Sequence, residues 1–252
     1  MLEIKNLSVN YGSKTILDQI SFRVNPGEWL MIMGPNGSGK STTVNAISGG
    51  ISYDGEILLD GKNVKQYKRK DLAAKIGILL QNHYVGYGFT VEEVVGLGRY
   101  AHKQGLFSSG KDESEELVER ALALTGMDAY RKQSILTLSG GELQRTFLAQ
   151  LLAQDPEIMI LDEPTNHLDL VYQKQVFELI EKWRETTGRT VISVVHDLSL
   201  ARAYGTHGVL LQKGKTVAYG AIEEIITPEI INPVYAMDVY QWMRDLYGQW
   251  SE

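Results

Sequence analysis

The stretch GPNGSGKST, residues 34–42, decides how the rest of the chain is interpreted. It matches the pattern G-x-x-x-x-G-K-[ST] in full. The glycines of this pattern let backbone N–H groups turn inward around phosphate oxygens, at a helix N-terminus whose partial positive charge favours anions. Lys40 would reach the β- and γ-phosphates and Ser41 would ligate Mg²⁺. The stretch therefore predicts a binding site for a nucleoside triphosphate.

The flanking segments supply the strand and the helix that such a loop requires. Residues 29–33 are apolar throughout, as expected for a strand covered on both faces, and residues 42–47 are expected to be helical. Residues 2–11 nearly alternate between apolar and polar, and residues 20–24 do so strictly. That period is typical of half-buried antiparallel strands.

The middle of the chain has a different pattern, which is mostly helical over residues 90–153. Thr90 can cap a helix whose first turn contains Glu92 and Glu93. Gly126 is placed to end a second helix. This pattern predicts a helical insertion into an α/β core.

Two further buried strands are expected at residues 158–161 and 190–195, with an amphipathic crossover helix around residues 172–183. Ligands of open α/β sheets lie at the carboxyl ends of strands. Polar residues occupy these ends, and we expect them to converge with the loop at residues 34–42.

Each of these strand-end residues has a candidate role. Asp162 could hold Mg²⁺, because a hard cation prefers oxygen ligands. Glu163 could polarise the water that attacks a γ-phosphate. His196 and Gln81 end strand-like runs, and Tyr11 is an aromatic residue at a strand end; alone, each of the three is weak evidence of function.

The stretch LSGGELQR, residues 138–145, predicts a helix start with Ser139 as cap and Glu142 completing a capping box. Its open N-terminal amides form a second candidate anion site. One chain needs one γ-phosphate site. A second site therefore indicates either a second ligand or the other half of a site shared in a dimer.

Composition excludes several classes of protein. The net charge is −6, with 31 acidic against 25 basic side chains, which argues against a nucleic-acid partner. There are no cysteines, so disulfides and Cys-ligated metals are excluded. The sequence shows no secretion signal and no apolar run near the ~18 residues of a spanning helix, so we expect a chain that is soluble by itself.

LSGGELQR resembles the signature of ATP-binding cassette (ABC) ATPases, and the order of the other motifs resembles theirs over nearly the whole chain. The resemblance implies an α/β fold: a P-loop NTPase (RecA-like) core with a mostly parallel sheet, an N-terminal antiparallel β-subdomain and an inserted α-helical subdomain. It implies a single ABC-type ATPase domain over residues 1–252, with the core at 1–88 and 154–252 and the insertion at about 89–153.

The resemblance also implies a role for each motif. Tyr11 would stack on adenine, Gln81 would sense Mg²⁺ and the attacking water, and His196 would contact the γ-phosphate. The implied catalytic residues are Lys40, Gln81, Glu163 and His196, and the implied metal ligands are Ser41, Gln81 and Asp162. The implied nucleotide contacts are Tyr11, Gly34, Pro35, Asn36, Gly37, Ser38, Gly39, Lys40, Ser41, Thr42, Ser139, Gly140, Gly141, Glu142 and Asp169.

In this family two cassettes pack head to tail, so that Ser139 and Gly141 of one copy cap the γ-phosphate held by Lys40 of the other. Residues 90–102, 162–176, 194–220 and 227–239 more closely resemble the ATPase subunits of bacterial importers for iron–siderophore complexes, haem and vitamin B12. The resemblance implies a homodimer that uses ATP and Mg²⁺. It would dock on two integral-membrane permease subunits at the inner, cytoplasmic face of the cell membrane, with a substrate-binding protein as an indirect partner.

Several alternatives stay open at this point. Importers of metal ions and polar amino acids share much of the pattern, and the catalytic residues do not separate import from efflux. A cassette acting in translation or DNA repair usually has paired cassettes or long coiled-coil insertions. A P-loop kinase or GTPase leaves LSGGELQR unexplained. Residues 240–250 receive no role, and Leu80 before Gln81 departs from the usual pattern.

Overall fold

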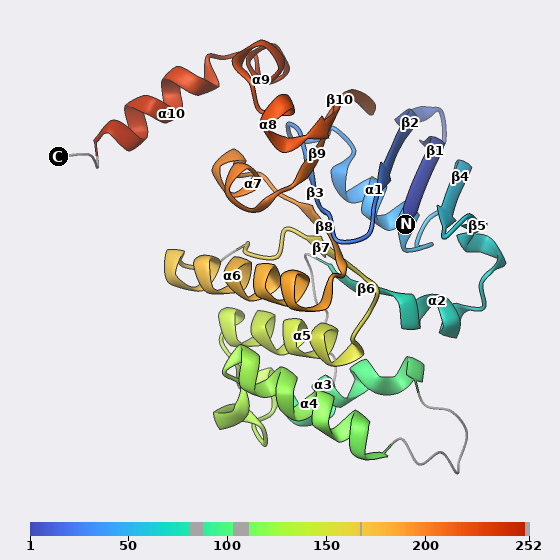
Figure 1. The fold of residues 1–252 in the computed structure, drawn as a ribbon, viewed down its shortest axis with the longest axis vertical. Helices are drawn as coiled ribbons and strands as arrows, with labels where there is room; N and C mark the ends of the chain where they lie inside the picture. The colour runs from blue at the N-terminus through green and yellow to red at the C-terminus, as the bar shows by residue number, and fades with distance from the viewer. Residues whose placement is uncertain (81–87, 103–110, 167, 250–252) are drawn as a thin grey trace. The chain divides into compact units, whose positions relative to one another are not determined.

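The fold is described from a computed structural model covering residues 1–80, 88–102, 111–166 and 168–249 (Figure 1). The chain divides into two compact units: unit 1 is Met1–Val64 with Ile192–Glu252, and unit 2 is Lys65–Val191. The helical segment expected at about residues 89–153 lies within unit 2.

Unit 1 begins with an antiparallel sheet in the order β2-β1-β4-β5. The strands are β1 (Leu2–Tyr11), β2 (Lys14–Val24), β4 (Asp54–Leu59) and β5 (Lys62–Asn63). Ile20, Phe22 and Val24 are buried, whereas the residues between them are exposed. The alternation in the sequence therefore predicted this antiparallel sheet correctly.

A second, mostly parallel sheet carries the glycine-rich loop of residues 34–42, called the phosphate loop below. In unit 1 its order is β10-β9-β3, with β8 beside β3. These strands are β3 (Trp29–Met33), β8 (Thr190–Val194, which crosses the division between the units), β9 (His207–Gln212) and β10 (Lys215–Ala221). β3 pairs in parallel with β9, and β10 pairs antiparallel with β9. All five residues of β3 are buried, as the unbroken apolar run predicts.

Helices complete unit 1. α1 (Lys40–Ile47) follows the loop, and α7 (Leu198–Tyr204), α8 (Ile222–Ile225), α9 (Pro228–Tyr235) and α10 (Val239–Gly248) form the C-terminal part (Figure 1). The Trp29 indole N–H donates to Ser193 Oγ at 2.8 Å, so a fully buried polar pair joins β3 to β8. α10 packs on α9 and carries exposed Trp242, which is 48% exposed.

Unit 2 contains a parallel pair of strands and the helical segment. β6 (Ile76–Leu79) pairs with β7 (Ile158–Asp162). The α-helices are α2 (Arg69–Lys75), α3 (Val91–Leu97), α4 (Lys111–Thr125), α5 (Gly140–Gln154) and α6 (Leu170–Thr187). The 3₁₀ turns are η1 (Val64–Gln66, which begins in unit 1), η2 (Gly98–His102), η3 (Asp128–Tyr130) and η4 (Ile135–Thr137). α4 and α3 both pack on α5, and α4 ends where Gly126 adopts φ 66°, as expected.

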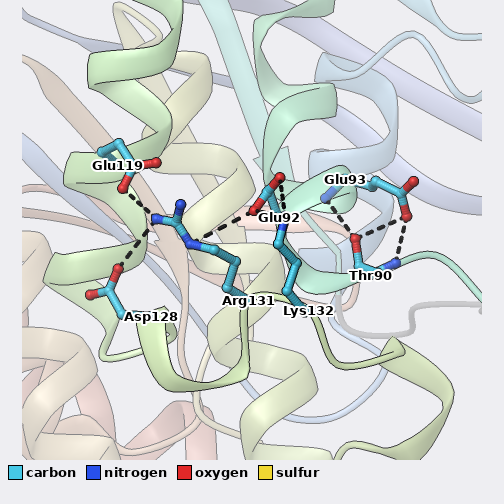
Figure 2. Close-up of polar contacts among 7 residues, drawn as sticks. All are labelled: Thr90, Glu92, Glu93, Glu119, Asp128, Arg131 and Lys132. Atoms are coloured by element: carbon cyan, nitrogen blue, oxygen red, sulfur yellow. Dashed lines mark hydrogen bonds and ion pairs between the residues drawn. The ribbon is translucent and has the colours of Figure 1, made fainter.

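Two sets of polar contacts hold the helices of unit 2 in place (Figure 2). Thr90 caps α3 in a capping box with Glu93, which confirms the expected cap. Arg131 lies between Glu119 of α4 and Glu92 of α3, with Arg131 Nε 3.7 Å from Glu92 Oε2. Its hydrogen bond to Glu119 raises the pKa of Arg131 and lowers that of Glu119. Exposed ion pairs each contribute little, so this network mainly fixes how η3 meets the two helices.

Over the described ranges, no helix is both long and apolar enough to cross a bilayer.

Candidate functional site

The phosphate loop lies in unit 1 between buried β3 and helix α1, which is the strand–loop–helix context that the sequence predicts. Gly34, Gly37 and Gly39 adopt φ values of 142°, 76° and 106°, a region that side chains disfavour. A Cβ atom at Gly34 would also clash with the Leu211 carbonyl oxygen, and one at Gly39 would clash with the Leu17 side chain. The loop therefore needs glycine at both positions.

Lys40 is the cation of this loop and is only 6% exposed. Its Nζ donates to the carbonyl oxygens of Gly34 at 2.8 Å and Pro35 at 3.2 Å. A buried ammonium group is stable only when its donors are satisfied, and here loop carbonyls hold it in place. The same group can exchange these neutral acceptors for phosphate oxygens, which form stronger, charge-assisted hydrogen bonds.

Ser38 is a second polar residue of the loop whose surroundings suit an anion. Its side chain is 3% exposed, and its Oγ has no hydrogen-bond partner among the described residues. Buried hydroxyl groups are normally satisfied, so an orphaned one calls for a ligand or water. The first turn of α1 contains no acidic residue, and its N-terminal amides favour negative charge. Loop and helix start together are therefore suited to binding an anion.

Two other predicted residues belong to unit 1. Tyr11 ends β1 with its side chain 55% exposed, so its ring is accessible for stacking. His196 is exposed just after β8. It precedes Asp197, which caps α7 by accepting from the Ser199 N–H at 2.7 Å. These positions leave both side chains accessible to a ligand.

Tyr235 is a contact of the loop that the sequence did not reveal. Burial raises the pKa of its hydroxyl, and a hydrogen bond between that hydroxyl and the Gly34 backbone lowers it by less. It ends α9, about two hundred residues after the loop in the sequence. The only sequence signal was the family-like tail at residues 227–239, which assigned no role to this residue.

Asp162 and Glu163 lie in unit 2 at the end of β7. Asp162 is 4% exposed, and Glu163 has a left-handed backbone with φ 54°. Such a conformation is costly for a residue with a side chain and is concentrated at functional sites. The Asn166 side-chain amide donates to Glu163 Oε2, and the Asn166 backbone N–H donates to the Glu163 carbonyl at 3.2 Å. The carboxylate is therefore held by a short turn.

The predicted capping box of α5 is present. The Glu142 N–H donates to Ser139 Oγ at 3.3 Å, while Glu142 Oε2 accepts from the Ser139 N–H and hydroxyl, each at 2.8 Å. The backbone hydrogen bond from Ser139 is the largest cause that lowers the pKa of Glu142, followed by the bonds from the Ser139 and Tyr130 side chains. Ser139 and Gly140 are exposed, so this helix start is open to an incoming group.

The start of α5 is tied to the turn that follows Glu163. Gln144 Nε2 donates to the Pro164 carbonyl at 3.0 Å. A Cβ at Gly141 would touch Leu168 at 3.5 Å. Asp169 Oδ1 accepts from the Tyr172 N–H at 2.9 Å and caps α6. Asp169 thus has a structural role, which is separate from the nucleotide contact implied for it.

The oxygen donors suit magnesium. Ser41 offers a hydroxyl and Asp162 a buried carboxylate, and Mg²⁺ prefers oxygen ligands while keeping several waters. Within the described ranges, no three His, Asp or Glu side chains form a self-contained metal cluster. Gln81, predicted as a third ligand and as a catalytic residue, lies outside the described residues.

Comparison with known proteins supplies independent information. Residues 17–166 match the family model described as ABC transporter. The ferric enterobactin transport ATP-binding protein FepC of Escherichia coli (strain K12) is 39% identical over 234 residues, which cover 92% of this chain and 86% of FepC. The hemin import ATP-binding protein HmuV of Pseudomonas entomophila (strain L48) is 36% identical over 245 residues, which cover 95% of this chain and 94% of HmuV.

A solved structure shares the fold. The dimeric post-hydrolysis state of the ATP-binding cassette MJ0796 bound to ADP and Pi superposes with a TM-score of 0.77 at 28% identity. The match covers 88% of this chain and 99% of that chain.

Proposed function

Because the chain belongs to the ABC transporter family of ATPases, we propose that it is the ATP-hydrolysing subunit of a bacterial importer for a ferric siderophore, haem or cobalamin. FepC and HmuV, which resemble it over nearly their whole length, are named for ferric enterobactin transport and hemin import. Cobalamin rests on the resemblance of residues 90–102, 162–176, 194–220 and 227–239 alone. The loop that buries Lys40 beside the orphaned Ser38 hydroxyl is the observation that carries ATP binding.

The proposed ATP site begins with this loop. Lys40 exchanges the Gly34 and Pro35 carbonyls for β- and γ-phosphate oxygens. Residues 34–42 wrap the phosphates with backbone amides, and the Ser38 hydroxyl gains the partner that it lacks. Tyr11 stacks on the adenine ring.

In the proposed reaction Glu163 is the general base. The Glu163 carboxylate orients a water molecule toward the γ-phosphorus and accepts a proton from that water. The Asn166 amide holds the carboxylate in position. His196 contacts the γ-phosphate, and Gln81 contributes to positioning the water. Ser41 and Asp162 are assigned to Mg²⁺, which when bound neutralises charge on the phosphate oxygens.

The proposed active unit is a homodimer with two shared sites. Ser139, Gly140, Gly141 and Glu142 of one copy face the γ-phosphate held by Lys40 of the other. The Ser139 hydroxyl donates to the Glu142 carboxylate at 2.8 Å. Arrival of the γ-phosphate therefore exchanges one anion for another at the same helix N-terminus, so ATP supplies part of the dimer interface.

The homodimer is proposed to dock on two permease subunits at the cytoplasmic face of the cell membrane, with a substrate-binding protein as indirect partner. ATP binding would close the dimer and hydrolysis would open it, which is a two-state element biased by the nucleotide. Purifying the tagged chain from native membranes in mild detergent tests this assignment. We expect a permease and a binding protein for an iron chelate to co-purify; ribosomes or DNA in their place would contradict it.

The catalytic assignment is tested by Glu163→Gln. The amide keeps the size of the side chain but cannot accept the proton, so we expect ATP to be retained, a nucleotide-bound dimer to accumulate, and turnover to fall by about 100-fold or more. Glu157→Gln, at an exposed glutamate of the same unit paired with Lys75, is the matched control. Hydrolysis at the parental rate in Glu163→Gln would show that the base is another group.

A further inference from the structure

We propose that Tyr235 is a positioning residue of the ATP site, which holds Gly34 at the start of the phosphate loop and keeps the loop in the shape that receives phosphates. Tyr235 ends α9, a helix of unit 1 that contributes no other group to the site. This role rests on the ATP site proposed above. It adds to that site a side chain that acts through the backbone of the loop.

Gly34 lies where three segments of unit 1 meet. It follows β3 and is buried, and a Cβ atom added to it would clash with the Leu211 carbonyl oxygen, so its backbone packs directly on that of β9. Half-buried Tyr235 reaches the same point from α9, with its hydroxyl bonded to the Gly34 backbone. That bond lowers the pKa of the hydroxyl, so it favours the ionised form. The Gly34 N–H is therefore the donor and the Tyr235 oxygen the acceptor.

The end of α9 is itself fixed against β9. Gln212, the residue after Leu211, donates from its side-chain Nε2 to the Val234 carbonyl at 3.1 Å. Val234 is buried and immediately precedes Tyr235. The backbone of Tyr235 is thus tied to the strand on which Gly34 packs, so its hydroxyl meets Gly34 from a fixed support.

The same hairpin supports the phosphate loop at a second point. Gly214 lies in the turn between β9 and β10, and its N–H donates to the Ser38 carbonyl at 3.1 Å. The Gly214 carbonyl accepts from the Asp18 N–H at 2.8 Å, which joins the turn to β2. The loop is therefore held at Gly34 and at Ser38, while the residues between these points include exposed Asn36. Its shape depends on both supports.

Gly34 links this support to the cation of the loop. Its carbonyl accepts from Lys40 Nζ at 2.8 Å, while its N–H donates to Tyr235. Removing the Tyr235 oxygen takes an acceptor from a buried N–H, which is costly. The loop can lessen that cost by shifting Gly34, and the shift moves the following amides out of the phosphate-binding shape. Affinity for phosphates then falls by the fraction of molecules that keep this shape.

The first test is calorimetric titration of the full chain with ADP and Mg²⁺, because ADP occupies the phosphate loop without being hydrolysed. Tyr235→Phe keeps the ring and removes only the hydroxyl, and we expect it to bind ADP about tenfold more weakly than the parent. Tyr240→Phe is the matched control. The Tyr240 hydroxyl also bonds to a backbone group of unit 1, the Ile226 carbonyl, so this variant loses a similar bond and should bind ADP like the parent.

Steady-state kinetics separate positioning from a merely structural role. We expect Tyr235→Phe to raise KM for ATP about tenfold and to leave kcat at the parental value, because the loop has the same shape in both proteins once the nucleotide is bound. A merely structural role would reduce the fraction of folded protein. The apparent kcat would then fall at an unchanged KM, and the urea midpoint would drop.

Three outcomes would overturn this role. If Tyr235→Phe binds ADP like the parent, Tyr235 does not position the loop, and the ATP site itself still stands. If Tyr235→Phe and Tyr240→Phe weaken ADP equally, the effect comes from the stability of the C-terminal helices. If Lys40→Ala binds ADP like the parent, the proposed ATP site is wrong and the role of Tyr235 fails with it.

Discussion

Glu163 combines a strained backbone with the role proposed for it as general base. Its φ of 54° places a side-chain-bearing residue in the left-handed region, which costs about 1–2 kcal/mol. Glycine would relieve that cost, although it loses about 0.5–1 kcal/mol in backbone entropy. This cost, at a residue next to buried Asp162, supports the role proposed for the Glu163 carboxylate.

A glycine replacement separates these contributions. Ala236, at the C-cap of α9, has the same φ of 54° and an exposed side chain. We expect Ala236→Gly to raise the free energy of unfolding by about 0.5–1 kcal/mol. Glu163→Gly should gain less, because it also loses the Asn166 hydrogen bond worth about 1 kcal/mol, and only it should abolish hydrolysis. Urea unfolding and ATPase assays measure both; a loss above about 2 kcal/mol in Glu163→Gly would assign the side chain a mainly structural role.

At the scale of elements, α3 and α5 begin with the same kind of N-terminal cap. Thr90 with Glu93 and Ser139 with Glu142 form capping boxes with matching hydrogen bonds. Helix capping therefore cannot distinguish the two helices. Ser139 differs from Thr90 only in its proposed contact with the γ-phosphate held by a second copy. Thr90 is therefore an internal control for Ser139.

We expect Ser139→Ala and Thr90→Ala each to lower the free energy of unfolding by about 1 kcal/mol, since each removes one cap. ATP-dependent dimerisation of a Glu163→Gln background should weaken only with Ser139→Ala. Urea unfolding and size-exclusion chromatography with ATP give the two readouts. If Thr90→Ala weakened dimerisation as much, the effect of Ser139 would be one of helix stability.

The elements also show what sequence patterns can and cannot predict. Strands such as β3 and β7 were predictable because an unbroken apolar run is typical of a strand buried on both faces. Capping boxes were predictable because they depend on residues three apart. The Gly34–Tyr235 and Ser38–Gly214 hydrogen bonds were not, because they join distant segments that have no common period. The backbone of Glu163 was not predictable either, because glutamate rarely adopts it.

At the scale of the whole molecule, titrating groups in unit 2 contribute to how stability depends on pH. Burial is the main cause that lowers the pKa of His102, whose Nε2 lies 2.8 Å from the Gln154 carbonyl oxygen. The unfolded chain then binds a proton more readily than the folded one, so stability falls as pH drops below the ordinary histidine value of ~6.5. The carboxylates of Glu93 and Glu119 have lowered pKa values, through Thr90 and Arg131 respectively. Their contribution is present above ~4.3 and is lost as pH falls further.

We therefore expect the free energy of unfolding to decline in two steps on acidification from pH 8. His102→Gln should remove the step below about pH 6.5, and Glu93→Gln should reduce the step below about pH 4.3. Urea unfolding at half-unit intervals of pH measures both. An unchanged profile in His102→Gln would show that another group causes the upper step.

The proposed shared site makes the strongest prediction at this scale, because it concerns two copies of the chain at once. Lys40→Ala removes the cation of the phosphate loop, and Ser139→Arg places a bulky cation at the start of α5. Each variant alone should lose hydrolysis, while Ser139→Arg should still bind ATP as a monomer. In a mixed dimer, the intact loop of the Ser139→Arg copy faces the intact Ser139 of the Lys40→Ala copy. One complete site is restored.

Half of the dimers in an equimolar mixture are mixed, and each contains one working site of two, so hydrolysis should recover to roughly a quarter of the parental rate if the sites act independently. ATPase assays of the mixture against each variant alone provide the measurement. A mixture of Lys40→Ala with Glu157→Gln is the control. In it, only sites that contain Lys40 of a Glu157→Gln copy should hydrolyse ATP. If each chain completed its own site, the Lys40→Ala and Ser139→Arg mixture would stay inactive, since neither copy has both halves.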